Sequence, residues 1–238
     1  MNAQREVGFQ NALVFSILLL ASSLAGAQSF PGQSPDKQFI KYQQKANSLF
    51  EDGQYERAMT VYRGDLAPVG DKYAQYMIGY MYFSGSGVPQ EQIIASAWYR
   101  LAAERGDESY VQVRDSLVPL LNDAQRQRSD KIFMELRSEL GDAALLMNLL
   151  REDIEFLQKR QKSDKFNIDS LGRRNHDRKR TAYTATAERM KVRMDYVQKL
   201  LSNDALTSEA ELTAYDALRE EALAEIESLE EFERGALL

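Results

Sequence analysis

Carboxylates are the most abundant side chains in this sequence that could carry chemistry, with 36 Asp and Glu residues against 30 Lys and Arg. Adjacent pairs occur at Asp107-Glu108 and at Glu152-Asp153. Acid–base catalysis by two carboxylates needs them to face each other across a cleft. Neighbouring residues of a helix point in different directions, and such pairs are typical of a solvated surface. No catalytic residue is therefore predicted.

The sequence contains no pattern typical of a metal site, a catalytic thiol or a phosphate-binding loop. The chain has no cysteine, and His176 is its one histidine, which excludes thiolate sites and leaves a single nitrogen ligand. The glycines of Gly85–Gly87 are followed by Val88 and Pro89 instead of the Lys-Ser/Thr of a phosphate loop. We predict no metal and no cofactor.

Tyrosine is distributed unevenly along the chain. Nine of the twelve tyrosines lie between Tyr42 and Tyr110. Tyr73, Tyr76 and Tyr80 follow one another at steps of three and four residues, which places them on one face of a helix. Because tyrosine combines a large contact area with a hydroxyl group, it is enriched in binding surfaces. This row is the predicted partner-binding surface. The alternative is a structural role, because Tyr76, Tyr80, Tyr82 and Tyr99 also have the spacing of residues that build the core of a repeat.

The tyrosine row lies in a stretch with the pattern of two helices joined by a glycine turn. Gly85 and Gly87 end the first helix, Pro89 suits the start of the second, and Gly106 ends the unit. Gly79 interrupts the first helix, which indicates close contact with a neighbouring backbone. The second helix carries small residues on one face, as in tightly packed helix pairs.

This stretch resembles a Sel1-like repeat, a relative of the tetratricopeptide repeat. The resemblance rests on Ala74, Gln75, Tyr76, Gly79, Tyr82, Gly85, Gly87, Val88, Ala97, Trp98, Tyr99, Ala102, Ala103 and Gly106. It implies an antiparallel helix pair that stacks into a superhelix and serves protein–protein contacts, often in bacterial envelope or secreted proteins. It implies no catalytic residues.

A repeat of about the same length recurs on both sides of this stretch. Gly-Asp occurs at Gly70-Asp71, Gly106-Asp107 and Gly141-Asp142. We therefore predict an all-α fold, with three helix pairs forming a short α-solenoid over residues 28–162. A helix from Asp142 to Asp164 with a leucine-rich stripe is predicted to cap the last pair; docking of a partner on this stripe is the alternative.

The first 27 residues have the pattern of a secretory signal peptide. An apolar run from Ala12 to Leu20 precedes the small residues Ala25-Gly26-Ala27, which suit cleavage before Gln28. An uncleaved membrane anchor is the alternative. We expect export to the periplasm or the outside of the cell, with no stable membrane span after cleavage.

Residues 163–180 are polar and basic and are predicted to be a linker. An anion site is one interpretation of its cationic cluster, and a solvated linker is the other. The cluster comprises Arg173, Arg174, Arg178, Lys179 and Arg180.

Residues 181–238 are predicted to form a helical hairpin or coiled coil. Two apolar seams are separated by a break at residues 202–204, and Ser208 with Glu211 forms a capping box for the second helix. The seam of the first helix comprises Tyr183, Ala187, Met190, Met194, Val197 and Leu201. The two helices can pair within one chain or form a homodimer.

Together these patterns predict an exported scaffold that docks an unidentified protein partner in the groove of its solenoid. A formal net charge of −6 argues against nucleic-acid binding. Two alternatives stay open: a cell-wall ligand-binding or hydrolytic protein, and a structural protein that self-assembles through its C-terminal helices.

Overall fold

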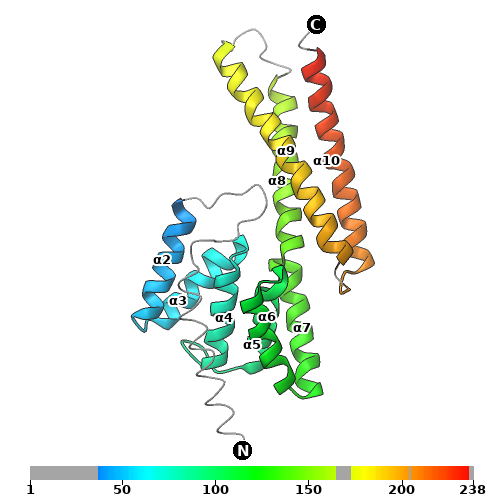
Figure 1. The fold of residues 1–238 in the computed structure, drawn as a ribbon. Coiled ribbons are helices and arrows are strands. Elements are labelled where there is room, and N and C mark those ends of the chain that lie inside the picture. The colour runs from blue at the N-terminus through cyan, green and yellow to red at the C-terminus, as the bar shows by residue number, and fades with distance from the viewer. Residues whose placement is uncertain (1–36, 165–172, 204, 236–238) are drawn as a thin grey trace, which may run out of the picture. The chain divides into compact units, whose positions relative to one another are not determined.

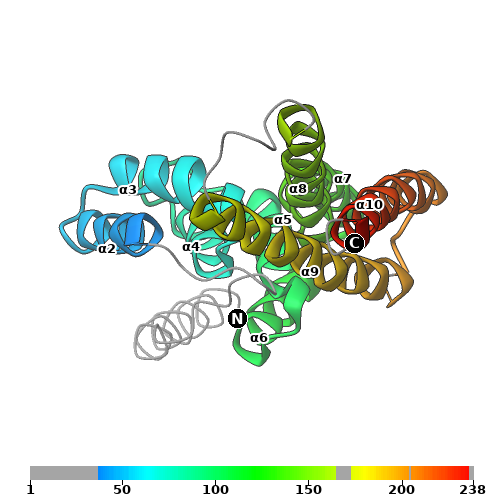
Figure 2. The same cartoon turned by 90° about the horizontal axis from the view of Figure 1, so that it is seen from above.

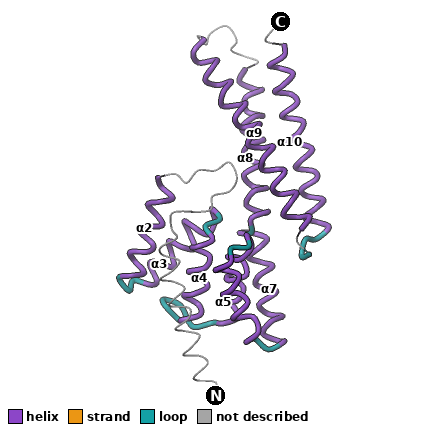
Figure 3. The backbone as a smooth tube through the Cα atoms, in the orientation of Figure 1, coloured by secondary structure: helices purple, strands orange, loops and turns teal. Residues whose placement is uncertain are grey.

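The computed structural model describes residues 37–164, 173–203 and 205–235, and this part of the chain consists of helices and short connections (Figures 1 and 3). The chain divides into two compact units between Gly141 and Asp142. The predicted signal peptide, residues 1–27, lies outside the described residues. No helix in the described ranges is long and apolar enough to cross a membrane.

The described part of the first unit contains six α-helices. Most of them pack on the helix that precedes or follows them in the sequence. Helix α2 packs on α3, α4 packs on α5, and α7 packs on α5 (Figures 1 and 2). A π-helical turn (Tyr62–Leu66) and a 3-10 turn (Ala67–Val69) extend α3. The helices are α2 (Lys37–Glu51), α3 (Tyr55–Val61), α4 (Lys72–Ser84), α5 (Gln92–Ala102), α6 (Glu108–Leu117) and α7 (Asp123–Leu140).

The first two Gly-Asp pairs have the same structural role: the glycine ends one helical segment, and the aspartate caps the next helix. Gly70 and Gly106 adopt φ of 79° and 74°, a left-handed conformation that favours glycine and ends the preceding 3-10 turn. Asp71 then caps α4, because its Oδ1 accepts hydrogen bonds from the backbone N–H groups of Tyr73 (3.0 Å) and Ala74 (3.3 Å). Asp107 caps α6 through the N–H of Ser109 (3.0 Å).

The third helix pair departs from this pattern. Gly141 has φ of −69°, so the last Gly-Asp pair does not repeat the left-handed turn. Helices α6 and α7 both pack on α5 and make few contacts with each other. The predicted third antiparallel pair is therefore not formed as a close hairpin, since both helices pack mainly on α5.

Close contact between α4 and α5 depends on Gly79. A Cβ atom added at Gly79 would lie 2.8 Å from Tyr99 Cδ1 and 3.3 Å from Trp98 Cβ. Tyr99 is 1% exposed and its ring packs on Tyr76, so it has no free space into which to move. The glycine that interrupts the predicted helix thus permits the approach of the two helices.

We expect Gly79→Ala to destabilise the first unit by about 1–3 kcal/mol, because overpacking outweighs the better helix propensity of alanine. Gly64→Ala is the matched control, since a Cβ at Gly64 meets nothing within 4 Å. Denaturant unfolding followed by circular dichroism measures both changes. Equal stability of the two variants would contradict the packing explanation.

The second unit consists of α8 (Asp142–Asp164), α9 (Arg173–Asn203) and α10 (Glu209–Gly235). Each of these helices packs on the other two. Ser208 and Glu211 form the predicted capping box, since the Glu211 N–H donates to Ser208 Oγ (3.2 Å) and the Ser208 N–H to Glu211 Oε2 (2.8 Å). The buried apolar core includes Leu146, Leu150, Ile154, Leu157, Ala187, Met190, Met194, Val197, Leu201, Tyr215, Leu218, Ala222, Ile226 and Leu229.

Two predicted boundaries differ from the structure. We expected α8 to cap the last repeat, but it forms one compact unit with α9 and α10, because its leucine stripe packs on their seams. We expected a linker over residues 163–180, but α9 begins at Arg173. Its first turns are rich in arginine and lysine, which are good helix formers. The two C-terminal helices pack on each other, and α8 joins them to form a three-helix unit.

Candidate functional site

The predicted tyrosine row does not form one open surface, because Tyr76 is fully buried. Its ring lies 5.4 Å from the ring of Tyr99 and 5.5 Å from that of Tyr110, measured between centroids. Burial raises the pKa of Tyr76 well above its ordinary value. Tyr76 is thus a core residue, and the prediction that it belongs to the partner-binding surface is wrong. Residues three and four apart share one side of a helix, but neighbouring helices can cover part of that side and leave the rest exposed.

Tyr73 is half-buried and faces the end of α3. Its ring lies 6.4 Å from that of Tyr62, whose hydroxyl donates a hydrogen bond to Asn47 Oδ1 (2.7 Å). Burial, followed by the negative charge of Asp71, raises the pKa of Tyr73 to about 12. Tyr73 therefore stays a neutral phenol at physiological pH and belongs to a packed polar region.

Tyr80 contributes to a partly exposed group of aromatic rings, which we call the aromatic cluster: Phe50, Tyr55 and Tyr80. The ring of Phe50 lies 5.1 Å from that of Tyr55 and 6.0 Å from that of Tyr80, both in edge-to-face orientation. Tyr55 is 37% exposed, and Phe50 and Tyr80 are half-buried. Helices α2, α3 and α4 each supply one ring, so the cluster spans the junction of the first two helix pairs.

A loop of the second helix pair supports the aromatic cluster. Gly87 lies so close to the start of α3 that a Cβ there would be 2.7 Å from the backbone N of Glu56 and 2.7 Å from Tyr55 Cβ. Gly87 also has φ of 73°. The position of Tyr55 is therefore set by backbone contact between the two helix pairs.

A buried carboxylate, Asp71, connects helices of the first unit next to Tyr73. Its Oδ2 accepts a hydrogen bond from Gln43 Nε2 on α2 (2.9 Å). Burial raises the pKa of Asp71, against the opposing effect of these hydrogen bonds. Lys72, also buried, donates from Nζ to the backbone carbonyl of Leu101 (3.0 Å) and pairs with Glu104 (2.9 Å). These contacts join α2, α4 and α5 and serve the packing of the helices.

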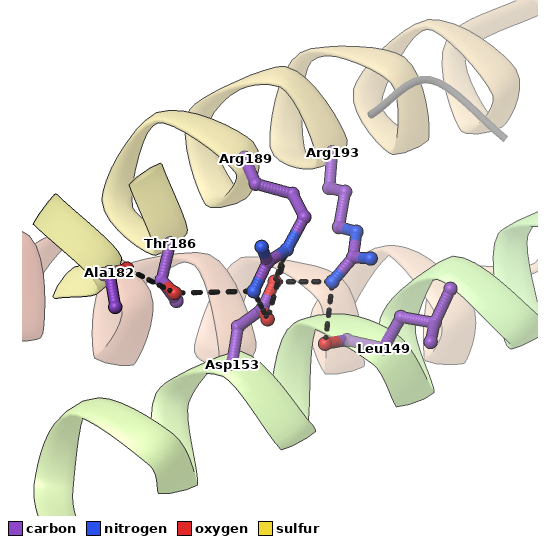
Figure 4. Close-up of polar contacts among 6 residues, drawn as sticks. All are labelled: Leu149, Asp153, Ala182, Thr186, Arg189 and Arg193. Carbon is purple, nitrogen blue, oxygen red and sulfur yellow. Dashed lines mark hydrogen bonds and ion pairs between the residues drawn. The ribbon is translucent and has the colours of Figure 1, made fainter. Parts of the chain in front are cut away.

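The second unit contains an ionic group in its core, which we call the Asp153 centre: Asp153 of α8 with Arg189 and Arg193 of α9 (Figure 4). Arg189 Nη2 donates to Asp153 Oδ1 (2.6 Å) and to Thr186 Oγ1 (3.2 Å). Arg193 Nη1 donates to Asp153 Oδ2 and to the backbone carbonyl of Leu149 (3.0 Å). Both oxygens of one carboxylate are thus used by two guanidinium groups.

The Asp153 centre is largely buried. The side chains of Asp153 and Arg193 are 7% and 6% exposed, and that of Arg189 is 33% exposed. Burial lowers the pKa of Arg193, the charge of Asp153 opposes this, and Arg189 adds to it. Arg193 Nε is buried and has no acceptor among the described residues. Within the centre, positive charge exceeds negative charge.

The buried carboxylates of Asp71 and Asp153 serve contacts within their own units. The oxygens of Asp71 and of Asp153 are occupied by hydrogen bonds within their own unit. Across the described residues, no group of three or more His, Cys, Asp and Glu side chains could hold a metal ion. What the two groups do in this structure is to hold helices together.

Comparison with known proteins identifies the central helix pair of the first unit. The family model described as Sel1 repeat matches residues 72–107, which cover α4, α5 and the left-handed turn at Gly106. The chain carries a Sel1 repeat. Sel1 repeats mediate protein interactions, and proteins that contain them are typically scaffolds without enzymatic activity. No curated protein and no solved structure matches this chain.

The residues on which the resemblance rests lie at turns or are at least partly buried in the described structure. Gly85, Gly87 and Gly106 have positive φ, and Gly79 lies against Tyr99. Tyr82 is half-buried against the core. Val88 is half-buried, and the other positions are almost completely buried: Ala74, Gln75, Tyr76, Ala97, Trp98, Tyr99, Ala102 and Ala103. These side chains build the repeat and leave its outer faces to other residues.

The Asp153 centre was missed by sequence reasoning, which took Glu152-Asp153 as surface charge. Glu152 is exposed as expected, but Asp153 is 5% exposed. A usable signal was present, because Asp153 follows Leu150 by three residues and precedes Leu157 by four, and so occupies a seam position. A charged residue at such a position indicates a buried partner of opposite charge.

The predicted anion site stays a prediction. Its members, Arg173, Arg174, Arg178, Lys179 and Arg180, lie in the first turns of α9 instead of in a linker. Their side chains, and that of His176, lie outside the described residues.

Proposed function

We propose that this chain is an exported interaction scaffold whose Sel1 repeat unit docks a partner protein on the aromatic cluster. The observation that carries the proposal is the cluster itself: three aromatic rings from α2, α3 and α4 remain partly exposed at the junction of two helix pairs. Export rests on the pattern of residues 1–27, from which we expect a processed chain that begins at Gln28.

The composition and the support of the aromatic cluster suit recognition of a protein. Tyrosine and phenylalanine are enriched at the centres of interfaces, where a few residues supply most of the binding free energy. The rings are held by packing on each other and by the contact of Gly87 with α3, so little conformational entropy is lost when a partner binds. The mechanism is docking of a partner on a rigid surface, without chemistry on the partner.

The test compares partner capture by the processed chain and by a Tyr55→Ala/Tyr80→Ala variant. Loss of an aromatic anchor at the centre of an interface costs about 2 kcal/mol or more, which is about a thirtyfold loss of affinity. Proteins of the native envelope are captured on each chain and identified by mass spectrometry, and the affinity of the specific partner is then measured by titration.

Met134→Ala is the matched control, because Met134 is a large apolar side chain with similar exposure, 39%, on α7. All chains are first compared by circular dichroism, so that a loss of binding is not a loss of fold. A partner retained by the control and lost by the double variant supports the proposal. Equal retention by both variants rules out the aromatic cluster as the docking surface.

A further inference from the structure

The Asp153 centre is more polar than the stability of the second unit requires. Its neighbours in the core are Leu150, Ile154, Met190 and Met194, all nearly or fully buried. Moving an ion pair out of water costs several kcal/mol per ion, and apolar side chains of similar size often stabilise a core as well or better. The centre therefore has to be explained by something other than stability.

The composition of the Asp153 centre increases the free-energy cost of burying its charges. Two guanidinium groups share one carboxylate, and Arg193 Nε has no acceptor in the described part of the chain. Exposed Glu152 adds some negative charge nearby, but it makes no hydrogen bond to either arginine in this structure. A buried donor without an acceptor is an additional penalty.

The remaining seam positions are mostly apolar, and apolar contacts distinguish little between one partner helix and another. Apart from Thr186 and Arg193, the buried side chains of α9 and α10 are alanine, methionine, valine, leucine, isoleucine and one tyrosine, Tyr215, whose hydroxyl donates to the backbone carbonyl of Met194 (2.6 Å). Such side chains pack on any helix that presents a matching apolar stripe, including the same helices of a second copy. In coiled coils, a single polar residue in the seam fixes register and the number of chains, at a cost in stability.

The Asp153 centre meets the requirements of such a selecting contact. Asp153 reaches Arg189 and Arg193 on successive turns of α9, and Arg193 also bonds the backbone of Leu149. A shift of α9 by one turn, or its replacement by α10, which has no basic residue among its buried positions, would leave buried charges unpaired.

We propose that the Asp153 centre selects α8 as the partner of α9, and so prevents the seam of α9 from pairing with α9 or α10 of a second copy of the chain. The centre is a specificity device that determines which helix α9 packs on. This inference does not depend on the docking function proposed for the Sel1 repeat unit.

The test replaces the centre with uncharged side chains of similar size in the processed chain: Asp153→Leu, Arg193→Leu and Arg189→Gln. Glutamine is chosen at Arg189 because that side chain is 33% exposed. An apolar residue there would add exposed hydrophobic surface, which could itself cause association. The control, Lys191→Gln/Glu230→Gln, removes an ion pair between α9 and α10 whose side chains are 43% and 55% exposed. Molar mass is measured by light scattering over a wide concentration range, and chain exchange by mixing two fluorescent labels.

The expected result is one mass for the parent and the control at all concentrations, and a concentration-dependent mass with chain exchange for the triple variant, at equal or higher melting temperature. A triple variant that keeps the parent's single mass and does not exchange chains overturns the proposal. So does a parent chain whose own mass depends on concentration through α9. If the triple variant loses its helicity, Asp153→Asn decides in the same assay: chain exchange supports the proposal, and a single non-exchanging mass overturns it.

Discussion

Asp153→Ala is expected to destabilise the second unit by about 3–5 kcal/mol, the largest effect that we predict for a single substitution. The variant leaves Arg193 buried and Arg189 partly buried without their carboxylate, and each loses a hydrogen bond to it. Unpaired buried charge is far more costly than the loss of a surface contact. Hydrogen exchange of the backbone amides in α8 and α9 measures the loss within the second unit alone.

Glu152→Ala is the matched control for this prediction, since the neighbouring carboxylate is exposed. It should change stability by no more than about 0.5 kcal/mol. Amides of α4 and α5 report on the first unit, where we expect no change, because the two units are compact by themselves. Salt gives a further distinction: a buried pair is screened little, so the effect of Asp153→Ala should persist at high ionic strength. Similar exchange in both variants would mean that Asp153 is solvated.

Gly87→Ala is expected to destabilise the first unit by about 2–4 kcal/mol. About 1 kcal/mol of this comes from placing alanine in a left-handed conformation, and about 1–3 kcal/mol from overpacking. The φ of Gly87 is 73°, and an added Cβ would lie 2.7 Å from backbone atoms of Tyr55 and Glu56. Backbone cannot move aside as a flexible side chain can, so the loop must separate from α3. Denaturant unfolding of the processed chain measures the change.

Gly106→Ala separates the two causes, because Gly106 has a nearly identical φ of 74° and an added Cβ would meet nothing within 4 Å. We expect this variant to lose only the conformational contribution, about 1 kcal/mol. If Gly87→Ala and Gly106→Ala lose the same amount, close contact between the loop and α3 does not exist in solution. Because Tyr55 belongs to the aromatic cluster, Gly87→Ala should also weaken partner capture, whereas Gly106→Ala should not.

The two units differ in how their helices are held together. In the Sel1 repeat unit, glycines allow close contact and aspartates cap helices, so that backbone geometry determines the packing. In the second unit, long seams without glycine pack by side chains alone, and a buried ionic group distinguishes one pairing from others. A short repeat with a fixed surface suits docking of a partner, whereas a three-helix unit with a selecting contact suits a defined number of chains.

The sequence by itself determined the features that depend on neighbouring residues. The helical class, the helix ends at Gly85 and Gly106 and the capping box at Ser208 were predicted and are present. The Sel1 repeat was recognised on the same local grounds and is matched by its family model. Caps, turns and helical periodicity act over a few residues, so their signals remain in a single sequence.

Only the tertiary structure decided which side of each helix is covered. Tyr76 is buried while Tyr80 is partly exposed, although both belong to the same row, because α5 and α6 supply rings that pack on Tyr76. Asp153 is buried while Glu152 is exposed, because two arginines 36 and 40 residues further along the chain face Asp153. Burial depends on contacts between helices that are distant in sequence, and the pattern of one helix does not contain them.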